Sequence, residues 1–150
     1  MRDATRVLAA AALAALLAST ATGADYSDYS GAELYHRFCA SCHGASGEGN
    51  GPVSKSFAVA VPDLTRISQR HGGQYPENWV YRVIDGRASL LSHGPRDMPV
   101  WGVELWREQG ADVTAGAKTR DVVARLVEYL HTLQVPRSLA EPGHGSAGTR

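Results

Sequence analysis

The sequence Cys39-Ala40-Ser41-Cys42-His43 lies in the first third of the 150-residue chain and decides how the rest is interpreted. Two cysteines three residues apart lie on one side of a helical turn, so both can bond to the vinyl groups of a single porphyrin. The adjacent histidine can then present an imidazole nitrogen to the iron. This C-x-x-C-H pattern is the attachment motif of c-type haem. It predicts one covalent haem c on Cys39 and Cys42, with His43 as an iron ligand.

Other uses of a cysteine pair fit the sequence less well. A thioredoxin-like site requires a βαβ context, and the chain shows no strand alternation. A zinc site requires about four ligands, and no second pair of cysteines or histidines follows at short spacing. A structural disulfide would fit an exported chain, but it would cross-link almost nothing within one helical turn.

A low-spin haem needs a sixth ligand, and in electron-transfer cytochromes this is commonly methionine. Apart from Met1, the chain holds a single methionine, Met98. It lies in a segment, residues 88–102, whose prolines and glycines interrupt any helical period and predict a long loop. We therefore expect Met98 to be the second iron ligand. The alternatives are that Met98 only fills core space, or that His93 of the same loop is the ligand.

Apolar periodicity predicts helices and no strands. Ser30 and Glu33 form a capping box that begins a first helix, which runs through the cysteine motif to Gly44. Further helices are expected over residues 76–85, 103–109 and 117–134. The predicted fold class is all-α, with three to five helices joined by long loops.

Together these features resemble a class I mono-haem cytochrome c, similar to the small bacterial members and to the cytochrome c domains of haem–copper oxidase subunits. The resemblance covers residues 31–134. The family has a glycine eight residues and an aromatic four residues before the first haem cysteine, as Gly31 and Tyr35 are here. Its last helix packs across the first with an aliphatic residue and an aromatic three apart, matched by Leu126 and Tyr129. Gly31, which has no side chain, would let the two helix backbones approach closely.

The resemblance also implies roles for residues around the haem. In the family a proline carbonyl accepts the free ring N–H of the proximal histidine, and we expect Pro52 to be that proline rather than a simple turn residue. Trp101 would pack on the haem edge with its indole N–H toward a propionate, or would serve only as core packing. Arg87 and Arg96 could offset propionate charge or be solvated on the surface.

The beginning of the chain has the layout of a secretory signal peptide. Arg2 and Arg6 precede an unbroken apolar run over residues 7–18, and Thr22-Gly23-Ala24 fits a cleavage site. Because a membrane span needs about 20 apolar residues, cleavage is favoured over a retained anchor. We expect residues 1–24 to be a cleaved signal peptide, 25–136 a periplasmic cytochrome c domain without a membrane span, and 137–150 a disordered tail.

The charge balance restricts the partners. The whole chain carries 15 Lys+Arg and 15 Asp+Glu, and removal of Arg2, Arg6 and Asp3 with the signal leaves 13 against 14, a net charge of −1. A balanced chain without a basic run is not expected to bind nucleic acid. Redox proteins, one donor and one acceptor, are the expected partners.

The predicted function is therefore that of an exported one-electron carrier and not of an enzyme. Two alternatives remain open from the sequence. The protein could be a tightly bound cytochrome subunit of an oxidoreductase complex. It could also be a haem enzyme or gas-binding protein with a displaceable sixth ligand.

Overall fold

The computed structural model describes residues 23–86 and 98–136. Within these two stretches the chain is helical and has no strand, which confirms the all-α prediction. Two of the six α-helices are single turns of four residues, so four longer helices carry the architecture. The α-helices are α2 (Gly31–Phe38), α3 (Ala40–His43), α4 (Ile67–Arg70), α5 (Glu77–Asp85), α6 (Trp101–Glu108) and α7 (Val113–Thr132); η1 (Ser54–Ser56) and η2 (Leu64–Arg66) are 3-10 turns.

The first helix begins as predicted but is divided in two. The Ser30 N–H donates to the Glu33 carboxylate at 2.8 Å and the Glu33 N–H donates to the Ser30 hydroxyl at 3.3 Å, which confirms the capping box. At Cys39 the backbone opens to φ −116°, well away from the helical value, and this turn separates α2 from α3. Helix α3 then ends at Gly44, as expected.

The later helices lie where the sequence predicts them, but some of them begin at other residues than expected. Helix α5 ends at Gly86, as predicted. Helix α7 starts four residues before the expected position because the Asp112 carboxylate accepts the Ala115 N–H at 2.7 Å and caps it there. Helix α6 also starts early, so Trp101 and Gly102 belong to its first turn and not to the loop that was expected over residues 88–102.

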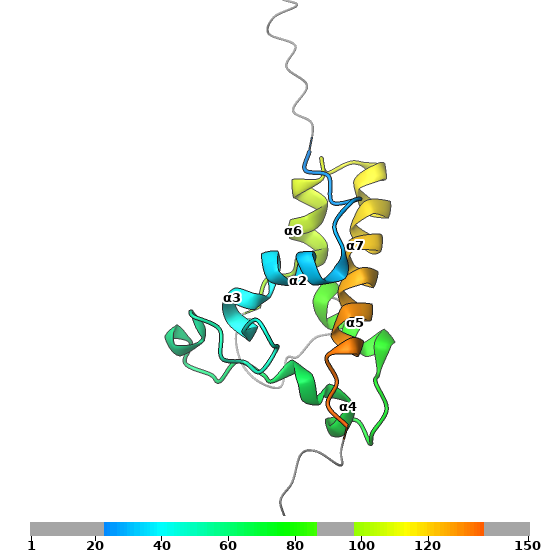
Figure 1. Cartoon of the computed structure of the whole chain (residues 1–150). Helices are drawn as coiled ribbons and strands as arrows, with labels where there is room; N and C mark the ends of the chain where they lie inside the picture. Colours follow the sequence, from blue (N-terminus) through cyan, green and yellow to red (C-terminus); the bar gives the residue numbers. More distant parts are fainter. Residues whose placement is uncertain (1–22, 87–97, 137–150) are drawn as a thin grey trace, which may run out of the picture.

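Helix α7 is the centre of the packing, with α2, α5 and α6 against it (Figure 1). Helix α2 runs across α7 at Gly31, where a Cβ atom would lie 2.9 Å from the Tyr129 Cβ and closer still to the Arg125 carbonyl. The expected close approach of the first and last helices at Gly31 is thus confirmed. The core lies between these helices and includes the fully buried Leu34, Tyr35, Leu105, Val122, Val123 and Leu126.

The chain leading into α2 is part of the packed domain. The Ala24 N–H donates to the Glu108 carbonyl at 2.7 Å, and the Asp25 carboxylate pairs with Lys118 at 3.1 Å. Tyr26 is buried and its hydroxyl donates to the Glu108 carboxylate. Residues 24–26 therefore fasten the start of the domain to α6 and α7.

Several sequence expectations concern residues outside the described stretches. These are residues 1–22 of the signal peptide expected over 1–24, the tail over 137–150, and His93, Arg87 and Arg96. Among the described residues, no helix is both long and apolar enough to cross a membrane.

Candidate functional site

The two cysteines and the histidine of the motif come together on one short stretch of helix. Cys39 is the residue that joins α2 to α3, and Cys42 and His43 lie on α3. Cys39 is buried and Cys42 half-buried, and no disulfide joins them. Burial, reinforced by the neighbouring Cys42, raises the pKa of the Cys39 thiol to about 12. Two cysteines within one helical turn and without a disulfide between them are what attachment of one porphyrin through two thioether bonds requires.

His43 is 8% exposed, and its ring is held by one hydrogen bond. Its Nδ1 lies 3.1 Å from the Pro62 carbonyl oxygen. Because a carbonyl can only accept, the proton must be on Nδ1, which leaves the Nε2 lone pair free. Burial lowers the pKa of His43 and the bond to Pro62 opposes this shift. A neutral, oriented imidazole with a free nitrogen is the form that binds haem iron.

The expectation that Pro52 would accept this N–H is wrong, because the carbonyl at His43 belongs to Pro62. The segment around Pro52 runs back along the α3 backbone: the Gly51 N–H donates to the Cys42 carbonyl and the Val53 N–H to the Ser41 carbonyl, each at 3.1 Å. Pro52 is thereby held, exposed, on the side of α3 that carries those carbonyls. The chain reaches the ring of the histidine only after a further loop.

Pro62 is positioned by hydrogen bonds of the residues that directly follow it. The Leu64 N–H donates to the Gly47 carbonyl at 2.6 Å, and the Asp63 carboxylate caps η2 by accepting the Thr65 N–H at 2.8 Å. The sequence contained a signal for this arrangement, because two prolines, Pro52 and Pro62, follow the motif within 20 residues, but it could not determine which of them lies beside the ring.

Tyr35 contributes more to the site than its aromatic ring. It is fully buried and its hydroxyl donates to the Gly44 carbonyl at 2.6 Å, directly after His43. This bond ties α2 to the end of α3 across the turn at Cys39. Burial raises the pKa of Tyr35, so the hydroxyl stays protonated and keeps its role as donor. The hydrogen bond was not predicted from the sequence.

The segment that carries Met98 and Trp101 belongs to the second described stretch, residues 98–136, and lies near the cysteine motif. Met98 and Trp101 are both partly buried and pack against the hydrophobic core. The Trp101 ring lies 5.3 Å, centre to centre, from the ring of Phe38, the residue directly before Cys39. The start of α6 is therefore next to the cysteine motif. The roles of Met98 as ligand and Trp101 as haem contact stay predictions.

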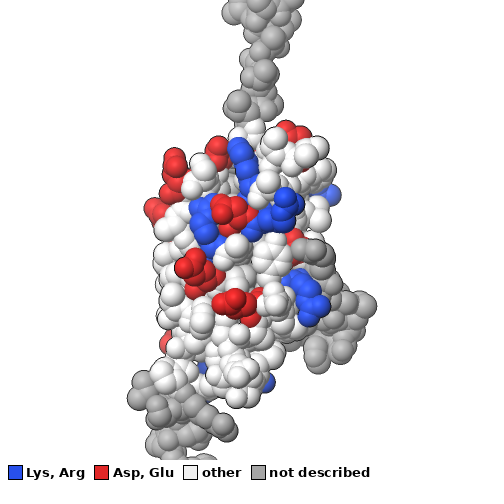
Figure 2. All heavy atoms as spheres, turned by 90° about the vertical axis from the view of Figure 1, so that its right-hand side faces the viewer, with Lys and Arg blue, Asp and Glu red and all other residues white. Residues whose placement is uncertain are grey.

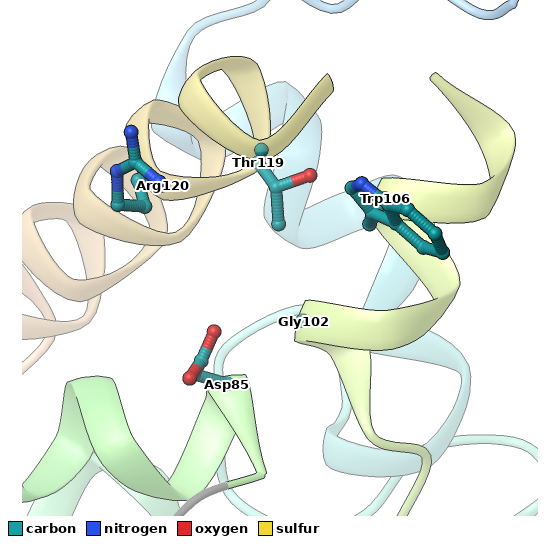
Figure 3. A pocket seen from close by; sticks show the side chains of 6 residues that line it. Asp85, Gly102, Trp106, Thr119 and Arg120 are labelled. Carbon is teal, nitrogen blue, oxygen red and sulfur yellow. The ribbon is translucent and has the colours of Figure 1, made fainter. Parts of the chain in front are cut away.

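The structure has an open cavity of about 270 Å³ away from the motif (Figure 3). It lies between the end of α5, the first two turns of α6 and the first half of α7. Its lining residues are Asp85, Gly102, Trp106, Gly116, Thr119 and Arg120. None of these comes from α2 or α3, so this cavity is not the haem-binding region.

The surface carries charges of both signs close together (Figure 2). Arg125 pairs with Asp121 at 2.7 Å and Lys118 pairs with Asp25 at 3.1 Å. On the face drawn in Figure 2 the cations and anions are interspersed, in keeping with the balanced composition.

The chain was compared with protein families, curated proteins and solved structures. The model of the family described as Cytochrome c matches residues 30–134, which is most of the chain. No match to the chain was found among curated proteins or solved structures. The matched region includes the C-x-x-C-H motif, the crossing helices α2 and α7, and Met98. The chain therefore belongs to the cytochrome c family, whose members carry out haem-based electron transfer with haem c bound covalently through a cysteine pair.

Proposed function

We propose that this protein is an exported carrier of single electrons, with its haem iron ligated by His43 and Met98. The observation that carries the proposal is the buried His43 ring, whose Nδ1 is bonded to the Pro62 carbonyl and whose Nε2 is free. A ring held in this way is a ligand prepared for one metal-containing group. When bound, haem c supplies a one-electron site that cycles between ferric and ferrous iron.

The protein residues have separate tasks in this proposal. Cys39 and Cys42 attach the group covalently and fix its orientation against α3. His43 supplies a strong nitrogen ligand, and its basicity is increased by the hydrogen bond to Pro62. Met98 supplies the thioether, which together with an apolar environment raises the reduction potential. With His43 and Met98 both bound to the iron, the protein would transfer electrons without binding a substrate there.

Partner binding follows from the family and from the surface. Cytochromes c exchange electrons with redox proteins, and we propose a donor and an acceptor in the periplasm. The first residues of the chain support export, because Arg2, Arg6 and the apolar run over residues 7–18 have the composition of a signal peptide. The mixed charges of Figure 2 favour weak docking with a modest dependence on salt.

Absorption spectra of the purified protein with a redox titration test this proposal. The expected result is one covalently bound haem that is six-coordinate and low-spin in both oxidation states, in a protein recovered from the periplasm without its first residues. A ferric haem that is high-spin at neutral pH, or that binds small ligands without competition, would contradict the carrier and favour a ligand-binding haem protein.

A further inference from the structure

Helix α6 starts in direct contact with the end of α5, and a glycine makes this contact possible. A Cβ atom on Gly102 would lie 2.6 Å from the Asp85 backbone oxygen and 3.0 Å from the Asp85 Cγ. No side chain can occupy that space unless α5 or α6 moves. Figure 3 shows Asp85 at the last turn of α5 with its carboxylate toward the first turn of α6, where Gly102 lies.

The same turn of α6 determines where Met98 can be. Only Pro99, Val100 and Trp101 separate Met98 from Gly102. The Val100 carbonyl accepts the N–H groups of Val103 at 2.9 Å and Glu104 at 3.1 Å, so Val100 is fixed to the helix. Pro99 has a restricted φ, which limits the connection further. A shift of Gly102 would therefore also shift Met98, because the three residues between them form a short and conformationally restricted segment.

Charge adds to the contact. Val100, the N-cap residue of α6, provides no side-chain hydrogen bond to the first turn of the helix. The Asp85 carboxylate lies against that turn, at the positive end of the helix dipole, where an anion is favourable. Asp85 therefore attracts the start of α6, while Gly102 allows it to come close.

We propose that the Gly102–Asp85 contact is the positioning element that holds Met98 at the distance required of an iron ligand. This inference rests on the proposed function, in which Met98 is that ligand. Neither residue touches the haem iron; both act through the start of α6. The open cavity of about 270 Å³ beside the contact, between α5, α6 and α7, gives the start of α6 room to shift, so a side chain at position 102 should displace Met98 and leave the domain folded.

The test compares Gly102→Ala with Gly116→Ala. Gly116 lines the same cavity, but its added Cβ would meet only the Arg120 Nη1, at 3.8 Å. In the ferric holoprotein, added imidazole competes with Met98 for iron, so its apparent affinity rises as the ligated fraction falls. We expect Gly102→Ala to increase imidazole affinity about tenfold or more, with a weakened far-red thioether–iron band, and Gly116→Ala to leave both unchanged.

Two further variants make the result decisive. Met98→Leu should abolish the thioether band. If it does while Gly102→Ala keeps the wild-type band and imidazole affinity, the positioning role is overturned and the ligation stands. If Met98→Leu changes nothing, both are overturned. Should Gly102→Ala fail to fold, Asp85→Ala decides: increased imidazole affinity at unchanged helix content supports the proposal, and unchanged affinity overturns it.

Discussion

The histidine side of the molecule, residues 39–65, and the methionine side, residues 98–102, are held by different kinds of contact. On the histidine side several hydrogen bonds hold the loop after the motif to α3: the Gly49 N–H donates to the His43 carbonyl at 2.8 Å, and the ring of His43 is bonded to Pro62. On the methionine side, Met98 and Trp101 pack against the core, and one close approach of Gly102 to Asp85 fixes the start of α6.

This difference determines how each side responds to change. Loss of one hydrogen bond among several weakens the histidine side by a small step, because the other bonds remain. The methionine side depends on where a whole helix begins, so a single added methyl group can displace it. The histidine side should therefore be the permanent anchor of the haem and the methionine side the adjustable one.

The largest effect is expected where both sides depend on the same core. Leu126 of α7 is fully buried beneath α2 and its neighbours. Leu126→Ala should destabilise the fold by about 2–5 kcal/mol, because it leaves a cavity in that core. Denaturant unfolding of the holoprotein measures this loss. Val113→Ala, at a residue that is 94% exposed, is the control and should change stability very little. Equal stability of the two variants would show that the histidine and methionine sides do not both depend on the core around α7.

A smaller effect is expected from the bond that ties α2 to the end of α3. Tyr35→Phe removes the donor to the Gly44 carbonyl, which keeps a second bond from the Gly47 N–H at 3.2 Å. The expected cost is about 0.5–1.5 kcal/mol of unfolding free energy, with Met98 ligation unchanged. The matched control is Tyr29→Phe, at an exposed tyrosine. A lost thioether band in Tyr35→Phe would mean that the two sides are not independent.

The two prolines after the motif allow a matched comparison of the histidine side. Pro52→Ala and Pro62→Ala each release one backbone restriction and should each cost about 0.4–1 kcal/mol. Only Pro62→Ala should loosen the carbonyl that accepts the His43 N–H. Weaker polarisation of the ring makes it a poorer donor to ferric iron, so the midpoint potential should rise in Pro62→Ala alone. Redox titration measures the midpoint potential. A changed potential in Pro52→Ala and not in Pro62→Ala would indicate that Pro52 accepts the His43 N–H.

The smallest effect is an acid-sensitive contribution from two exposed aspartates. Bonds from the Ser27 N–H and then from Lys118 lower the pKa of Asp25 to about 2, and the Ala115 N–H lowers the pKa of Asp112. A depressed folded-state pKa stabilises the fold above the ordinary value of 3.8, and this stabilisation is lost as the pH falls toward 2. Asp25→Asn and Asp112→Asn should flatten the dependence of thermal stability on pH across this window, and thermal unfolding between pH 2 and pH 4 measures it.

The sequence predicted the fold wherever a local pattern is strong. The capping box at Ser30, the stop at Gly86 and the glycine at position 31 all act through their own backbone or through one neighbouring helix. The motif itself gave the haem attachment, because C-x-x-C-H is a strong local signal. The helix break at Cys39 carries no comparable signal, and α3 and α4 are too short for their periodicity to be recognised.

The errors at the site come from contacts distant in sequence. Which proline faces His43 depends on how the loop folds back on α3, and spacing alone does not determine this. Gly102, in the first turn of α6, lies against Asp85, and a long connection separates these two residues in the sequence. The bond from Tyr35 to Gly44 likewise requires the turn at Cys39. Tertiary contacts of this kind override local propensity and had to be seen in the structure.

The most direct test of the proposed electron carrier is the ferric spectrum and midpoint potential of Met98→Leu, with Val103→Leu of α6 as the control. Met98→Leu keeps the apolar volume but removes the only thioether apart from that of Met1. We expect the far-red thioether–iron band to disappear and the midpoint potential to fall in Met98→Leu, while Val103→Leu stays like the wild type. An unchanged spectrum and potential in Met98→Leu would contradict the proposal.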